Sequence, residues 1–73
     1  MTEKAHNVIV QARKALGLSQ WQMSGLCHMS LSVYQKTETG ARIPTIDEAK
    51  HIADILNISY ELFYQEDDVS RET

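Results

Sequence analysis

One segment, residues 18–40, constrains the fold more than any other, because signals that start and end helices follow each other closely there. Ser19 and Ser30 each precede a short stretch with apolar residues at helical spacing, and their hydroxyl oxygens can accept from the free amides of a first turn. Gly40 closes the second stretch, since glycine tolerates the left-handed conformation that ends many helices. The segment is predicted to form two short helices joined by a tight turn, over about residues 20–27 and 31–39.

The rest of the chain reads as further helices. An N-terminal helix is predicted over about residues 2–16, and Pro44 then marks a boundary. Thr45 with Glu48 forms a capping-box pattern before a fourth helix. Ser59 caps a short fifth helix over about residues 60–64. The predicted inward faces of the first and fourth helices are Ala5, Val8, Ile9, Ala12 and Leu16, and Ile46, Ala49, Ile52, Ala53 and Leu56. These agreements predict an all-α fold, a compact five-helix bundle.

Size and composition narrow the class of protein. A chain of 73 residues forms one small domain, predicted over residues 1–64 with an acidic, flexible tail over 65–73. A single cysteine, Cys27, and three scattered histidines give no disulfide framework and no metal site, and no cofactor or small-molecule ligand is implied. No apolar run reaches the length of about 20 residues that spans a membrane. The N-terminus lacks the pattern of a signal peptide, so we expect a cytoplasmic protein.

Charge argues mildly against a nucleic-acid partner, because the net charge is −3 and DNA-binding proteins usually present a basic face. The distribution weakens that objection. Residues 1–64 hold six basic and six acidic side chains, and the deficit lies in residues 65–73. A neutral domain can still present a locally positive surface, and we expect any DNA binding to be strongly salt-sensitive.

Two short capped helices in succession have the layout of a helix-turn-helix, whose second helix enters the DNA major groove. The order and spacing of short fragments along residues 5–64 resemble the phage repressor and Cro type of this motif, the lambda-repressor-like or XRE family. The fragments are Leu18–Gln20, Met23–Ser24, Met29–Ser30, Glu38–Gly40, Pro44–Ile46 and Asn57–Phe63. The resemblance implies a small helical domain that binds a pseudo-palindromic operator in double-stranded DNA as a homodimer.

The same resemblance implies that the helix over about 31–39 is the recognition helix. The side chains expected to contact bases are Leu31, Ser32, Gln35 and Lys36. Those expected to contact phosphates are Gln20, Trp21, Ser30, Thr39 and Arg42. The chemistry fits, since lysine donates to guanine, glutamine can read adenine and leucine can contact a thymine methyl. Trp21 could instead form a dimer contact, and partial packing against the first helix or the loop is an equal alternative to either role.

Two further sets of residues have alternative interpretations. Arg13 and Glu38 match an interior ion pair of the family, which would fix the recognition helix; otherwise both are solvated surface charges. The candidates for a dimer interface are Ile58, Tyr60, Phe63 and Tyr64, which could instead close the intramolecular core. We expect a division, with Ile58 and Phe63 inside and the two tyrosines partly at an interface.

The chain departs from the family pattern at three positions. His28 stands where a glycine is usual in the turn, which strains the turn if this residue has a positive φ. Ser24 replaces an alanine, so its hydroxyl must bond back to its own helix. Thr37 replaces a larger apolar residue, which leaves the core under the recognition helix under-filled unless Tyr34 or Trp21 compensates.

The leading hypothesis is a sequence-specific transcriptional regulator that acts by occupying an operator. The alternative is a protein-interaction module of the same fold, such as an antitoxin or a co-regulator, which the acidic tail favours. An enzyme is not indicated, because the chain has no nucleophile and base at a supporting spacing, no phosphate loop and no paired-carboxylate pocket.

Overall fold

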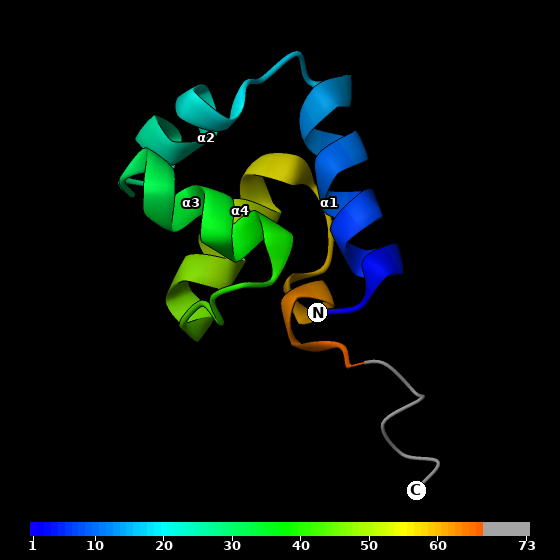
Figure 1. Ribbon diagram of the computed structural model, residues 1–73. Coiled ribbons are helices and arrows are strands. Elements are labelled where there is room, and N and C mark those ends of the chain that lie inside the picture. Colours follow the sequence, from blue (N-terminus) through cyan, green and yellow to red (C-terminus); the bar gives the residue numbers. More distant parts are fainter. Residues whose placement is uncertain (67–73) are drawn as a thin grey trace, which may run out of the picture.

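The computed structural model describes residues 1–66, which contain four α-helices followed by one 3-10 helix (Figure 1). The elements are α1 (Glu3–Ala15), α2 (Gln20–Leu26), α3 (Leu31–Thr39), α4 (Ile46–Leu56) and η1 (Tyr60–Tyr64). The all-α prediction is confirmed, but the prediction of five helices is wrong. The last segment is a 3-10 helix, in which the Leu62 amide donates to the Ser59 carbonyl at 3.3 Å. Five residues are too few to build a stable α-helix here. Most of the predicted acidic tail lies outside the described residues.

Capping side chains set the start of each helix. The hydroxyl of the residue before each helix accepts from an amide of the first turn, at Thr2, Ser19, Ser30, Thr45 and Ser59. Both capping boxes, Ser19 with Gln22 and Thr45 with Glu48, are present. α1 is shorter than predicted by one residue at each end, because Thr2 and Leu16 are its caps, and α2 ends one residue earlier than predicted because Cys27 is its C-cap.

The hydrophobic core draws on every element. Its buried members are Ile9, Met23, Cys27, Tyr34, Ala49, Ile52, Leu56 and Phe63. The prediction of an inward position is wrong for three residues: Val8, Leu16 and Ile46 are 38%, 54% and 49% exposed. The inward row of α1 instead runs through Ala5, Ile9 and Arg13 at four-residue spacing, which turns Val8 aside. Leu16 follows the last helical residue and Ile46 begins α4, so neither faces the packed middle of a helix.

In Figure 1, α1 stands on one side of the molecule and the α2–α3 pair on the other, with α4 behind α3. The 3-10 helix packs on α4 and α1, close to the N-terminus. α3 packs on α2 and α1 through its inner face. Its outer face is not covered by another described element. Among residues 1–66, no helix has the length and apolar character needed to cross a membrane.

Candidate nucleic-acid interface

The turn between α2 and α3 is closed by a backbone hydrogen bond from the Met29 amide to the Ser24 carbonyl, at 2.9 Å. His28 has a φ of 58°, so a histidine occupies the left-handed position at which the family has glycine. That conformation costs a residue with a Cβ about 1–2 kcal/mol. The Ser24 hydroxyl donates to the Trp21 carbonyl at 2.7 Å, as its burial requires. The turn is tight and slightly strained, and its polar groups are satisfied.

α3 divides cleanly into a buried and an exposed side. Tyr34, Thr37 and Glu38 are buried and attach the helix to the rest of the domain. The exposed side holds the four residues predicted to read bases and one residue predicted to contact phosphate: Leu31, Ser32, Gln35, Lys36 and Thr39. Lys36 makes no ion pair within residues 1–66, so its ammonium group is available to an external acceptor.

The buried carboxylate of Glu38 fixes the end of α3. The Nε atom of Arg13 donates to Oε2 at 2.9 Å and Nη2 donates to Oε1 at 3.2 Å. Oε2 also accepts from the Tyr34 hydroxyl at 2.6 Å, and Oε1 from Nε2 of Gln20 at 3.1 Å. The remaining guanidinium nitrogen, Nη1, donates to the Leu18 carbonyl at 2.8 Å. Four donors on one carboxylate join α1, α2 and α3 into a single unit.

The electrostatics of this cluster agree with an ionised pair. Burial alone would raise the pKa of Glu38, but the hydrogen bonds from Arg13, Tyr34 and Gln20 together hold it below its usual value. The hydrogen bond to Glu38 raises the pKa of Arg13. Burial, with the neighbouring Glu38 carboxylate, raises the pKa of the Tyr34 phenol. The side chains of Arg13 and Glu38 are 10% and 2% exposed, so they are interior charges rather than solvated ones.

The side chain of Gln20 makes more contacts within the protein than a simple phosphate contact would. It is half-buried, and while its Nε2 donates to Glu38, its Oε1 accepts from Nε2 of Gln35 at 3.0 Å. The first residue of α2 thus links the interior carboxylate to an exposed side chain of α3.

Arg42 is also more engaged than the sequence predicts. Nη1 donates to the Thr37 hydroxyl at 3.1 Å, and Nη2 pairs with the Glu48 carboxylate at 3.0 Å. The threonine that replaces an apolar residue of the family therefore receives Arg42, and its own hydroxyl donates to the Val33 carbonyl at 2.8 Å. A phosphate contact by Arg42 would have to use its remaining N–H groups.

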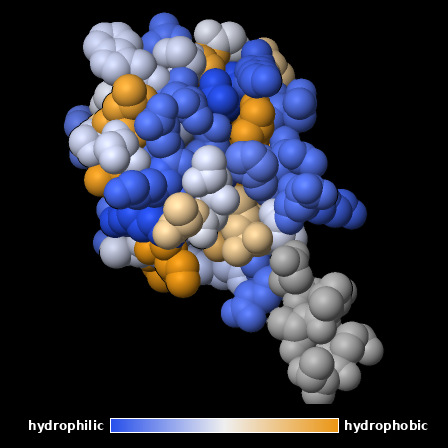
Figure 2. Space-filling view, viewed as in Figure 1, coloured by the Kyte–Doolittle hydropathy of each residue, from blue (hydrophilic) through white to orange (hydrophobic). Residues whose placement is uncertain are grey.

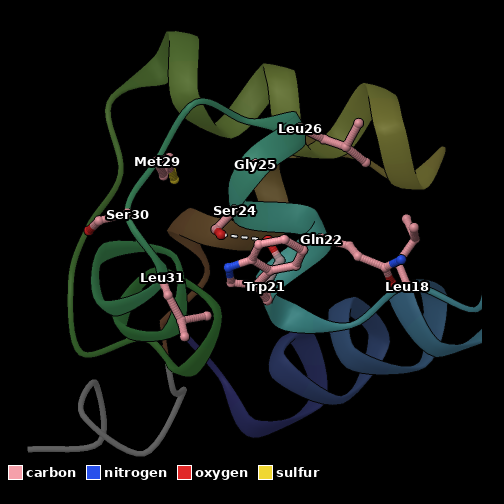
Figure 3. A pocket seen from close by; sticks show the side chains of 9 residues that line it. All are labelled: Leu18, Trp21, Gln22, Ser24, Gly25, Leu26, Met29, Ser30 and Leu31. Carbon is pink, nitrogen blue, oxygen red and sulfur yellow. Dashed lines mark hydrogen bonds between the residues drawn. The ribbon is translucent and has the colours of Figure 1, made fainter.

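An apolar groove of about 620 Å³ lies beside the turn, between α2 and the start of α3 (Figure 3). Trp21 is 71% exposed, so it does not fill the core under α3; its ring stands over the groove, and Leu31 projects over it from α3. The hydroxyl of Ser30, also on the groove, caps α3 by accepting from the Val33 amide at 3.2 Å. The groove is lined by Leu18, Trp21, Gln22, Ser24, Gly25, Leu26, Met29, Ser30 and Leu31.

The dimer candidates separate into buried and accessible residues. Phe63 is only 3% exposed and belongs to the core, so it presents no surface to a partner. Ile58, Tyr60 and Tyr64 are half-buried, and the Tyr64 hydroxyl donates to the Pro44 carbonyl at 2.9 Å. Figure 2 shows apolar side chains on one face as separate orange patches among polar ones. No group of three or more metal-ligating side chains gathers within residues 1–66.

Sequence reasoning missed three members of the network around Glu38. Tyr34 was predicted to point inward, and a buried phenol one turn before a buried carboxylate is a signal that could have identified the bond. His6 donates from Nδ1 to the Glu38 carbonyl oxygen at 2.7 Å, which ties α1 to the end of α3. Nothing in the sequence pairs His6 or the amide of Gln20 with Glu38, because these contacts depend on how the helices pack.

The helix-turn-helix family profile matches residues 9–63. Since the match covers more than half of the chain, the protein belongs to the helix-turn-helix family, with a DNA-binding domain of the XRE class. Over 51 residues the chain is 39% identical to the cryptic phage CTXphi transcriptional repressor RstR of Vibrio cholerae serotype O1. The alignment covers 70% of this chain and 46% of that protein, so the chain spans about half the length of this relative. No solved structure matches the chain.

Proposed function

We propose that this protein is a sequence-specific transcriptional repressor of the cytoplasm that binds operator DNA through α3. The observation that carries the proposal is the division of α3 into two sides. Its inner side is fixed by the buried Glu38 cluster, and its outer side presents side chains able to read bases. Contacts to base edges require a helix held at a defined angle to the groove, and a fully bonded interior carboxylate supplies such rigidity. The resemblance to a phage repressor supports the same function.

In this proposal, Leu31, Ser32, Gln35 and Lys36 contact base edges. Lys36 donates to the O6 and N7 acceptors of guanine, and Leu31 contacts a thymine methyl. Phosphates are met by hydroxyl, amide, indole and guanidinium donors on α2, at both ends of α3 and in the loop after it, which position the protein without reading sequence. These donors are Gln20, Trp21, Ser30, Thr39 and Arg42.

A homodimer is the proposed binding form, because two recognition helices one DNA turn apart read a pseudo-palindrome. Two exposed isoleucines between the end of α3 and the start of α4, Ile43 at 78% and Ile46 at 49%, support a dimer surface together with half-buried Tyr60 and Tyr64. Sedimentation of the protein with and without Ile43→Asp tests it: a concentration-dependent dimer that the variant abolishes is expected. A monomer at all concentrations, free and on DNA, would exclude this interface.

The experiment that tests DNA recognition is selection of bound sequences from a random DNA pool, followed by affinity measurements at roughly 50 and 200 mM salt. Wild type is expected to select one operator and to lose affinity as salt rises. Lys36→Ala should lose about 1–3 kcal/mol of discrimination at one base pair. Lys14→Ala is the matched control, because Lys14 is an exposed lysine of α1 that is not among the predicted DNA contacts.

If no sequence is enriched and low-salt binding is absent, DNA recognition is excluded. The exposed Trp21 and its apolar groove would then favour the alternative function, a protein-interaction module.

A further inference from the structure

Two hydrogen bonds link three residues in one direction, from the interior to the outer face of α3. This chain of hydrogen bonds, here termed the amide relay, consists of Glu38, Gln20 and Gln35. Nε2 of Gln20 donates to Glu38 at 3.1 Å, and Nε2 of Gln35 donates to Oε1 of Gln20 at 3.0 Å. Within residues 1–66, the Gln35 Oε1 atom has no hydrogen-bond partner, and this side chain is exposed.

The direction of this chain follows from the charge at its inner end. An ionised carboxylate only accepts hydrogen bonds, so the NH2 group of Gln20 must face Glu38 and its carbonyl oxygen must face away. That oxygen in turn accepts, so Gln35 must direct its own NH2 group toward Gln20. A flip of either amide would place two acceptors against each other. The pKa of Glu38 is held below its usual value, so the carboxylate stays ionised and the direction persists at neutral pH.

We infer that Gln20 is a positioning residue for specificity, which makes Gln35 present its carbonyl oxygen to DNA. This inference rests on the proposed function, since it requires α3 to lie in the major groove. A carbonyl oxygen accepts from the amino groups that adenine and cytosine expose there, whereas guanine exposes two acceptors at its O6 and N7. The relay therefore favours an adenine or a cytosine over a guanine at the base that Gln35 faces, since guanine leaves the outward carbonyl oxygen unpaired and can use only the second N–H of the amide.

The inference gives Gln20 a second role beyond the phosphate contact proposed for it. A phosphate contact contributes equally to every DNA sequence, because it carries no base information. A positioning residue acts at one base pair only. Removing it frees the Gln35 amide to rotate and to offer its NH2 group to guanine.

The test measures the affinity of wild type, Gln20→Met and Gln35→Ala for all single-base variants of the selected operator. Gln35→Ala identifies the base pair concerned. There, wild type should disfavour guanine by about tenfold, and Gln20→Met should reduce that penalty to about threefold or less. Gln11→Met is the matched control, since Gln11 is an exposed glutamine of α1, and should change no preference. Thermal melts verify that each variant remains folded.

A second measurement needs no DNA. The side-chain NH2 resonances of Gln35 in the free protein should shift in Gln20→Met and not in Gln11→Met. Uniformly weaker binding of Gln20→Met, with every base preference unchanged, would overturn the inference and leave the proposed function standing. Unchanged preferences in Gln35→Ala would overturn it as well. If wild type selects no DNA sequence, both the proposed function and this inference fail, and the NH2 resonances then report only whether the relay exists.

Discussion

The Tyr34 hydroxyl donates a 2.6 Å hydrogen bond to Oε2 of Glu38, one helical turn further along α3. Both residues are buried, at 0% and 2% exposure. The bond therefore joins the aromatic core to the interior carboxylate within α3 itself. Because that carboxylate also receives Arg13 from α1, the orientation of α3 depends on a core side chain and an ion pair together.

Tyr34→Phe should destabilise the domain by about 1.5–3 kcal/mol, because it removes a donor from a buried charged acceptor while keeping the ring in the core. Urea denaturation measures the loss. Tyr60→Phe is the matched control, since the Tyr60 hydroxyl has no hydrogen-bond partner within residues 1–66, and its loss should be close to zero. Equal losses in the two variants would show that the Tyr34 bond contributes nothing specific.

Glu38→Gln should destabilise the domain by about 3–5 kcal/mol at pH 7, because it leaves the buried Arg13 charge unpaired. The pKa of Glu38 in the folded protein lies below its value in an unfolded chain, which is near 4.3. As pH falls, the folded state therefore binds fewer protons than the unfolded state does. The contribution of Glu38 to stability is therefore complete above the unfolded value and is lost as pH falls through the folded pKa. Denaturation from pH 7 to pH 3 should give a steeper loss for wild type than for Glu38→Gln.

Glu48→Gln is the comparison for that pH dependence. The hydrogen bond from the Thr45 backbone, with Arg42, lowers the pKa of Glu48, but the pair is partly exposed. Glu48→Gln should therefore remove a smaller part of the acid sensitivity of wild type than Glu38→Gln does. An unchanged pH profile in Glu38→Gln would mean that Glu38 does not carry the charge assigned to it.

Helix positions were predictable from the sequence because caps act locally. A serine or threonine before a helix bonds to amides two or three residues later, so Ser19, Ser30 and Thr45 mark starts that packing does not alter. Burial was less predictable. Ile46 has the right spacing for the core face of α4 but begins the helix, and only the packed structure shows that it stays 49% exposed.

The candidate interface was predictable in outline for the same reason. The exposed side of α3 follows from helical periodicity once Tyr34 and Thr37 point inward. The engagement of Gln20 with Glu38, and of Arg42 with Thr37 and Glu48, involves side chains brought together by tertiary packing. Because of these contacts, the two residues predicted to contact phosphates, Gln20 and Arg42, also help to hold the domain together.

His28→Gly should stabilise the domain by up to about 1 kcal/mol, because glycine adopts the φ of 58° without the steric cost of a Cβ. Asn57→Gly is the comparison, since Asn57 has the same φ but asparagine tolerates this conformation better, and its gain should be smaller. Urea midpoints measured side by side give the answer. A loss of stability in His28→Gly would show that the imidazole makes contacts worth more than the strain.

Gly40→Ala should cost more stability than Gly17→Ala, although both glycines have a positive φ, of 87° and 72°. Each substitution places a Cβ in the left-handed conformation, which destabilises the folded state by about 1 kcal/mol or more. A Cβ at Gly17 would meet nothing within 4 Å, whereas one at Gly40 would lie 3.1 Å from Cβ of Met1. The Gly40 variant must therefore also displace the N-terminal residue from the end of α3. Urea denaturation of the two variants isolates this packing contribution, because the conformational penalty is common to both. Equal losses would mean that Met1 yields freely, and that the contact between the N-terminus and the end of α3 does not help to hold α3 in place.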